Sequence, residues 1–305
     1  MHPRQRTLRT SASCSGIGVH SGKEVNLTIH PAPANHGIKF VRTDLPNSPD
    51  ISAHFNQVVD TSLATVIGYD GFIVSTIEHL MAAFAGMSID NALVEVDAYE
   101  MPIMDGSAGP FTDLILKAGV ETQQSPRCYF IIKEPIELKA ENKFVGLYPA
   151  PQFKISCAIE YDHPLIRKQS YAIELSEKTF ETDICRARTF GFLYEYDMLK
   201  RFGLAQGGSL DNCVVIDKEK ILNPDGLRYQ DEFVRHKILD CIGDFSLLGM
   251  PLLGHIVLDK SGHAFNHAFL MKFFSQKSSW ETQSCFSDLN TAAVCDAMTE
   301  LPCIR

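Results

Sequence analysis

The sequence lacks the marks of several large protein classes. Its nine cysteines are scattered and contain no C-x-x-C pair, and no glycine-rich phosphate loop of the dinucleotide or P-loop type is present. Basic stretches are also missing, because 28 Lys and Arg are outnumbered by 37 Asp and Glu, which gives a net charge of -9. A nucleic-acid binder would show a basic stripe, so we expect no nucleic-acid partner.

Long hydrophobic runs are absent as well. The most apolar stretch, residues 247–258, is interrupted by Gly249, Pro251 and Gly254, and it is shorter than the ~20 residues of a membrane span. The N-terminus carries charge without an apolar segment behind it, unlike a signal peptide. We therefore expect a cytoplasmic protein without a transmembrane segment, whose cysteines are reduced and mostly buried.

The remaining composition is that of a globular protein with a sizeable core. The 305 residues are 45% hydrophobic and 21% charged, and this length suggests two domains. Polar segment 121–127 is the expected linker. Strands and helices are mixed without strict alternation, which favours an α+β fold. The patterns predict strands at 24–29, 64–69, 72–74, 91–96, 255–258 and 264–268, and helices at 75–85, 110–118 and from 231.

The long helix that begins at Asp231 carries a candidate metal site. At ~100° per residue, His236, Asp240 and Asp244 share one face, beside Lys237, while the apolar residues form another. A His and an Asp at i,i+4 can both reach one metal ion. The alternative is a solvated helix face with an ordinary His–Asp contact.

A third ligand is expected from the Glu78-His79 pair. A catalytic zinc requires three protein ligands and an open position, and hydrolysis requires a nearby carboxylate base. Glu78 and His79 offer a base and a ligand in neighbouring residues, although the H-E-x-x-H motif is absent. The alternatives are a capping box formed by Ser75 and Glu78, and a partly buried surface histidine at position 79.

His263 is a candidate proton donor. It follows Ser261-Gly262 in a short turn that we expect to lead into a strand. A histidine there can protonate a departing amine if a carboxylate keeps it charged, and Asp244 is the candidate carboxylate. The alternative is an ordinary loop histidine.

Seven segments have to be considered together: 16–22, 75–79, 103–107, 186–192, 207–209, 233–237 and 260–263. Together they resemble one known family, the UDP-3-O-acyl-N-acetylglucosamine deacetylases, over nearly the whole chain. These zinc enzymes catalyse the committed step of lipid A synthesis in Gram-negative bacteria. The resemblance implies that this chain hydrolyses the acetamide of the UDP-linked, acylated amino sugar.

The resemblance also implies an architecture. It consists of two similar α+β domains, each a sheet layer against a helix layer, packed with helices facing helices and the active site between them. Residues 1–126 would form the domain that supplies Glu78 and His79. Residues 127–305 would form the domain that supplies His236, Asp240 and His263. An insert at about 192–215 would form the acyl passage.

The resemblance further assigns roles in catalysis. It implies one Zn²⁺ on His79, His236 and Asp240, with Fe²⁺ as a second candidate for the same site. The other implied roles are Glu78 as general base, His263 as general acid, Asp244 as the group that orients it, Thr189 as the oxyanion donor and Lys237 as a contact to sugar and phosphate.

The substrate contacts implied by the family are spread along the chain. Phe190 and Tyr161 are expected to contact substrate, the latter near the uridine, and Lys143 and Lys260 to contact the diphosphate. Gly208 and Ser209 would lie near the acyl passage. We expect a monomer, and we assign no function to the tail after about Ser284.

Two rival functions use the same residues. Two histidines and a carboxylate also form the facial triad of Fe(II) enzymes, but that triad needs no adjacent base. A non-catalytic binder of nucleotide sugars or acyl chains would be expected to have lost a ligand or the base. Every expected catalytic position is filled here, so the hydrolase is the favoured interpretation.

Overall fold

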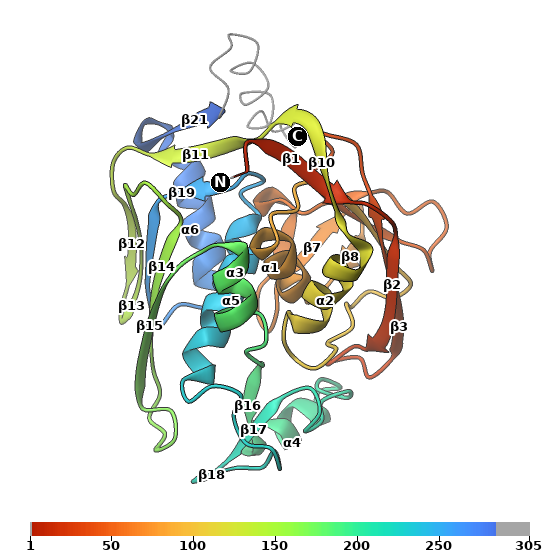
Figure 1. Ribbon diagram of the computed structural model, residues 1–305. Coiled ribbons are helices and arrows are strands. Elements are labelled where there is room, and N and C mark those ends of the chain that lie inside the picture. The colour runs from red at the N-terminus through yellow and green to blue at the C-terminus, as the bar shows by residue number, and fades with distance from the viewer. Residues whose placement is uncertain (1, 285–305) are drawn as a thin grey trace.

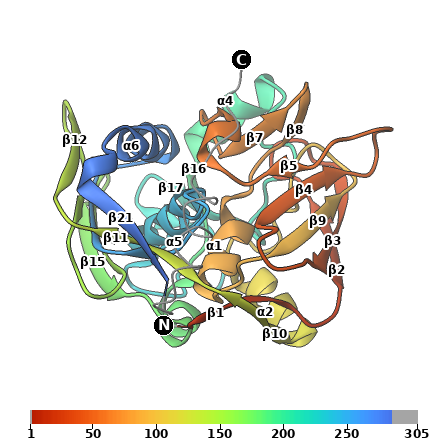
Figure 2. The ribbon, with the colours of Figure 1, turned by 90° about the horizontal axis from the view of Figure 1, so that it is seen from above.

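The computed structural model describes residues 2–284. The tail after about Ser284, to which we assign no function, lies outside the described residues. Two five-stranded sheets form the outer layers of the molecule, and the helices lie between them (Figure 1). The layers therefore run sheet, helix, helix, sheet, which confirms the predicted α+β fold with helices facing helices (Figure 2).

The first sheet has the strand order β2-β3-β9-β4-β5. Its strands pair antiparallel except for β9 and β4, which run parallel. Alternate residues of β3, Val25, Leu27 and Ile29, are fully buried, as expected for a sheet with one face on the core. The bounds are β2 Ala12–Ile17, β3 Glu24–Pro31, β4 Ile38–Arg42, β5 Ile51–Ser52 and β9 Ala92–Val96.

The second sheet repeats this topology in the order β12-β13-β20-β14-β15. Again the only parallel pair joins the third and fourth positions, β20 and β14, and the other pairs are antiparallel. The two halves are therefore similar in build. The bounds are β12 Ile136–Ala140, β13 Lys143–Tyr148, β14 Lys154–Glu160, β15 Lys168–Glu174 and β20 His255–Asp259.

Each sheet is covered on its inner face by two main helices, and α1 and α5 face each other at the centre (Figure 2). Among the described residues, no helix has the length and apolar character needed to cross a membrane. The bounds are α1 Glu78–Gly86, α2 Gly109–Ala118, α5 Glu232–Ser246 and α6 His263–Ser275, with short helical turns at α3 Glu177–Thr179, η1 Phe55–Gln57, η2 Phe180–Ile184 and η3 Lys277–Ser279.

Smaller sheets complete the fold. In the lower part of Figure 1, strands β16 and β17 pair parallel, and helix α4 connects them as a βαβ unit. The bounds are β6 Val58–Asp60, β7 Val66–Tyr69, β8 Phe72–Val74, β16 Phe190–Phe192, α4 Leu193–Arg201, β17 Val214–Asp217, β18 Lys220–Ile221, β1 Arg4–Leu8, β10 Val120–Pro126, β11 Cys128–Ile132, β19 Leu252–Leu253 and β21 Trp280–Ser284.

Three local predictions were wrong. Segment 121–127 is not a free linker, because most of it forms β10, which pairs antiparallel with β1. Segment 264–268 is helical rather than extended, since Asn266, Phe269, Leu270 and Phe273 are buried at the three- and four-residue spacing of a helix. The helix expected from Ser75 begins at Glu78.

The cysteines follow the expectation in part. Cys157, Cys185 and Cys241 are buried free thiols, and Cys14 and Cys213 are free and half-buried. Cys128 is disulfide-bonded, so the prediction of reduced thiols is wrong at that position.

Candidate metal and acid–base site

Three buried side chains from two facing helices converge at the centre of the molecule. His79 comes from the first turn of α1, and His236 and Asp240 come from successive turns of α5. Asp240 Oδ1 lies 3.2 Å from His236 Nε2 and 3.8 Å from His79 Nε2. All three ligand atoms lie within 4.8 Å of one another. The interpretation of this helix face as solvated is therefore wrong.

The hydrogen bonds around the cluster fit a bound cation. His236 Nδ1 donates to the carbonyl oxygen of Ala187 at 3.0 Å, which leaves the lone pair of its Nε2 directed at the cluster. Within the described part of the chain, the buried Asp240 Oδ1 accepts no hydrogen bond. An unpaired carboxylate oxygen beside two imidazole nitrogens is costly without a positive partner, and a divalent metal supplies one.

The electrostatics of the cluster favour the ligand forms of its residues. Burial, with the neighbouring His236, lowers the pKa of His79 to about 3, so its imidazole is neutral. Burial by itself raises the pKa of Asp240, but His236 and Lys237 outweigh it and hold this pKa below its ordinary range. Lys237 Nζ donates to Asp240 Oδ2 at 2.9 Å. Two neutral imidazoles and one carboxylate make up a donor set suited to a catalytic metal.

Glu78 lies beside the cluster as a buried carboxylate. Its Oε2 accepts a hydrogen bond from the backbone N–H of Thr65 at 3.1 Å. Burial raises the pKa of Glu78 to about 7. The capping-box alternative is wrong, because Ile77 occupies the N-cap position and Ser75 Oγ lies 3.3 Å from Thr76 Oγ1 instead. Glu78 is thus available as a base near neutral pH.

His263 lies close to Glu78 and comes from a third helix. It is the first residue of α6, and its Nε2 lies 3.9 Å from Glu78 Oε1. Its Nδ1 lies 2.9 Å from Asp244 Oδ2. Burial opposes the charged form, but Asp244 prevails and raises the pKa of His263 to about 10. His263 is therefore a charged, oriented imidazolium and not an ordinary loop histidine.

Two residues that sequence reasoning missed hold this arrangement. The Thr65 hydroxyl donates to Asp244 Oδ1 at 2.6 Å, while its backbone N–H binds Glu78. The Asn266 amide donates to Asp244 Oδ2 at 2.8 Å. Thr65 carries no sequence signal of this role. Asn266 would have been recognised one helical turn from His263 had the segment been predicted as a helix.

A cavity of about 500 Å³ opens from these residues. Thr189, Phe190 and Lys237 line it together with Glu78 and His263. Its far wall is apolar and comes from the βαβ unit, where Phe192, Leu193, Tyr196, Leu199, Gly208 and Ser209 line it.

Three predicted substrate contacts are not among the residues that line this cavity. Tyr161 packs edge-on against Phe190 with ring centroids 5.8 Å apart, one layer behind the wall. Lys260 pairs with Glu160 at the ends of β20 and β14, and Lys143 begins β13 next to them in the sheet. All three lie at the same end of the second sheet, from which the chain continues into His263.

Comparison with known proteins places this sequence in a family. Residues 5–275 match the family described as UDP-3-O-acyl N-acetylglycosamine deacetylase. The chain belongs to this family. A UDP-3-O-acyl-N-acetylglucosamine deacetylase from Myxococcus xanthus is 53% identical over 277 residues, which cover 91% of this chain and 88% of that protein.

More distant relatives carry the same name. The protein from Syntrophus aciditrophicus is 47% identical over 92% of this chain and 89% of its own length. The protein from Teredinibacter turnerae is 47% identical over 95% of this chain and 96% of its own length. Deacetylases are amide hydrolases, so membership of this metal-dependent family identifies the chain as an enzyme and removes the non-catalytic alternative.

Proposed function

We propose that the chain hydrolyses the acetamide of UDP-3-O-acyl-N-acetylglucosamine, giving acetate and UDP-3-O-acyl-glucosamine, the committed step of lipid A synthesis. The observation that carries this proposal is the buried His79, His236 and Asp240 cluster beside a carboxylate base and a charged imidazole. Membership of the deacetylase family supports the substrate class.

We propose Zn²⁺, one per chain, as the ion held by His79, His236 and Asp240, with Fe²⁺ as a second candidate for the same ligands. When bound, the ion supplies a Lewis acid that activates water and polarises a carbonyl. The donor set alone also suits an Fe(II) oxygenase. Glu78 and His263 favour hydrolysis instead, because an oxygenase needs neither a general base nor a general acid beside its metal site.

The chain's own residues account for the proton transfers. Glu78, whose pKa is raised to about 7 by burial, takes the proton of the attacking water. The Thr189 hydroxyl donates to the oxyanion that develops on the former carbonyl oxygen. His263, held by Asp244, gives its proton to the departing amine, which leaves as a neutral group.

The substrate is proposed to extend in two directions from this centre. The apolar wall of about 192–215, with Gly208 and Ser209, would receive the acyl chain. Phe190 and Lys237 would contact the sugar and the adjoining phosphate. Lys143, Lys260 and Tyr161 would bind the diphosphate and uridine, which is supported by their position at the sheet end next to His263.

We further propose a monomeric, cytoplasmic enzyme with a domain boundary at residues 126 and 127. A site complete within one chain supports the monomer, and a nucleotide-linked substrate supports the location. On this division, α1 with Glu78 and His79 belongs to the first domain, and α5 and α6 belong to the second.

The proposed function is tested by removing the base. Glu78→Ala should retain bound zinc and substrate but lose most acetate release, because the ligands remain while proton removal is lost. Glu134→Ala, at an exposed position, serves as the matched control. Metal content is measured by elemental analysis, and apoenzyme restored with zinc or iron alone identifies the active ion. Near-normal turnover of Glu78→Ala would contradict the assigned base.

A further inference from the structure

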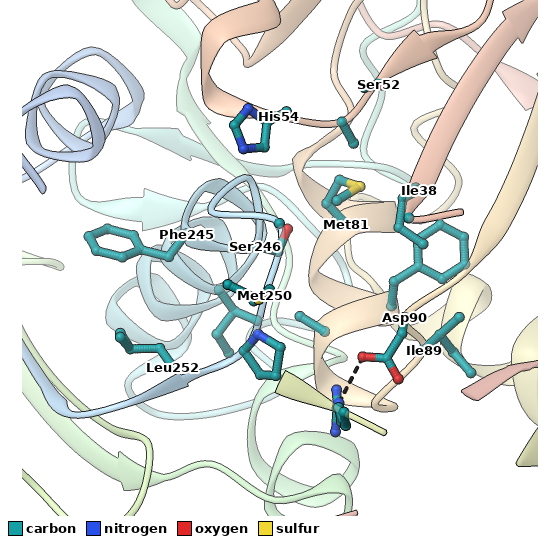
Figure 3. Close-up of a pocket in the computed structure, with 18 of the residues that line it drawn as sticks. Ile38, Ser52, His54, Met81, Ile89, Asp90, Phe245, Ser246, Met250 and Leu252 are labelled. Atoms are coloured by element: carbon teal, nitrogen blue, oxygen red, sulfur yellow. Dashed lines mark hydrogen bonds and ion pairs between the residues drawn. The ribbon is translucent and has the colours of Figure 1, made fainter. Parts of the chain in front are cut away.

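A second cavity, of about 340 Å³, lies between the two halves and shares no lining residue with the catalytic cavity. It is bounded by Met81 and Phe84 of α1 and by Ile242 and Phe245 of α5. Figure 3 shows Met81 and Phe245 on the facing helices, with His54 and Asp90 at opposite ends of the cavity. The same two helices carry the metal ligands.

The space persists because small residues occupy positions where larger ones would close it. Ala85 and Ser246, near the C-terminal ends of α1 and α5, both line the cavity. Its volume is roughly twice that of the ~150 Å³ apolar cavity known to bind benzene. It also lies within the range of about 300–1,000 Å³ typical of small-molecule sites.

The polar groups of the cavity favour an uncharged ligand. The charged side chains that line it, Asp90 and Arg127, neutralise each other through a 2.7 Å contact. The second oxygen of Asp90 accepts the backbone N–H of Arg6 at 2.8 Å. Neither charge is therefore left to attract a charged ligand, and desolvating such a ligand would be costly.

His54 offers one hydrogen-bond acceptor at the other end. Its Nδ1 donates to Asn56 Oδ1 at 2.9 Å, so its Nε2 carries the lone pair. Burial lowers the pKa of His54, which keeps the imidazole neutral. A donor such as a hydroxyl group is the complementary partner for this nitrogen.

We propose that this cavity is an effector site for a small, uncharged, largely apolar molecule that places a hydrogen-bond donor at His54, and that its occupancy lowers turnover. The effect on turnover rests on the proposed deacetylase function, whereas binding does not.

The packing of α1 against α5 provides the coupling. Gly243 of α5 lies against the backbone of Glu78, so closely that a Cβ added there would overlap the Glu78 carbonyl oxygen. The catalytic cluster and the cavity are both built on these two helices around this contact. Because the contact has no slack, a ligand that alters the packing of α1 against α5 at the cavity also shifts Glu78 relative to the metal ligands.

Binding is tested on the full-length, metal-loaded protein with 2-naphthol as the probe. Calorimetry should show one saturable site, with at least tenfold weaker binding of 2-naphthoate, which is charged. Ala85→Leu should weaken 2-naphthol binding at least tenfold while retaining the melting temperature. Ser246→Leu, which also loses the hydrogen bond from its hydroxyl to the Gly243 carbonyl, should independently weaken binding at least tenfold. Ala140→Leu, at an exposed position, should change nothing. The proposed binding site would be overturned if 2-naphthol bound Ala85→Leu and Ser246→Leu as tightly as wild type, or if 2-naphthoate bound as tightly as 2-naphthol.

Turnover is then measured with and without 2-naphthol. We expect kcat to fall with KM unchanged in the wild type, and no effect in Ala85→Leu. A rise in KM alone would mean competition at the catalytic cavity and would overturn the proposal. Saturable binding without a change in kcat would overturn the coupling. Absence of acetate release without the probe would refute the proposed function and leave the binding test intact.

Discussion

Two aspartates one helical turn apart on α5 have different surroundings. Asp240 has one oxygen bound to Lys237, while the other lies among the imidazoles and accepts no hydrogen bond from the described residues. Asp244 is saturated by donors from Thr65, Asn266 and His263. The first arrangement leaves a lone pair for a cation, and the second fixes the position and charge of a histidine. The same residue type thus serves two tasks because its hydrogen bonds differ.

The alkaline side of the pH profile should depend on Asp244. Because this carboxylate raises the pKa of His263 to about 10, the imidazole keeps its proton below that pH and loses it above. As a general acid, His263 should therefore support activity up to about pH 10. Asp244→Asn removes the charge, so the pKa of His263 falls and the alkaline limb of kcat/KM moves to lower pH. If the alkaline limb of Asp244→Asn stayed at the wild-type pH, the proposed pairing of Asp244 with His263 would be contradicted.

Thr65 should matter for stability as well as for activity. Thr65→Val keeps the shape of the side chain but removes the hydroxyl that binds Asp244. We expect the free energy of unfolding to fall by about 1–3 kcal/mol, because a buried charged acceptor loses a donor. Thr122→Val, at an exposed position of β10, should change it by less than about 0.5 kcal/mol. Equal denaturant midpoints for Thr65→Val and wild type would count against this role.

At the scale of elements, the α1–α5 pair determines the site. Gly243 lets the two helices approach until backbone meets backbone at Glu78. This approach brings His79, one residue further along α1, to the ligands of α5. Close packing of this kind tolerates no added methyl group without a backbone shift.

Gly243→Ala should therefore damage both stability and catalysis. Overpacking is expected to cost about 1–3 kcal/mol in the free energy of unfolding, and turnover should fall because Glu78 is displaced. Gly262→Ala is the stability control, since an added Cβ meets nothing within 4 Å there and the backbone is extended. Denaturant unfolding and acetate release measure the two effects. A stable, fully active Gly243→Ala would show that the contact has slack.

Elements governed by local sequence were predictable. The strands predicted at 64–69 and 72–74 form β7 and β8, joined by a tight turn with φ of 50° at Asp70 and 83° at Gly71, and α2 ends at Ala118 as predicted. The long helix also begins at the expected place. By contrast, β10 is a strand because β1, from the start of the chain, pairs with it. The short polar sequence of β10 does not indicate that it pairs with β1, which is more than 100 residues away in the chain.

At the scale of the whole molecule, two halves with the same strand topology contribute unequal parts of one site. The first supplies Glu78 and His79, and the second supplies His236 and Asp240. The i,i+4 spacing within α5 pointed to two ligands from sequence. Nothing local shows that His79 meets them, because this convergence depends on the packing of two layers built from separate sheets.

Metal removal should therefore loosen the contact between the halves. A ligand that binds only the native state stabilises it by about 2.7 kcal/mol at a hundredfold excess over Kd. Chelation should lower the Tm by about 4 °C, and added zinc should restore it. His79→Ala should show no such response, because one ligand is missing. An identical Tm with and without chelator in the wild type would contradict a metal shared by both halves.

The burial of α1 also has a consequence during protein synthesis. Its residues are almost all buried, and α5 covers the side that faces away from the first sheet. Helix α5 begins at Glu232, roughly 100 residues after β10 ends. At ribosomal rates of 5–20 residues per second, this gap lasts about 5–20 s. During that interval the nascent chain presents the apolar side of α1 to the surrounding water, a window in which chaperones and proteases compete for it.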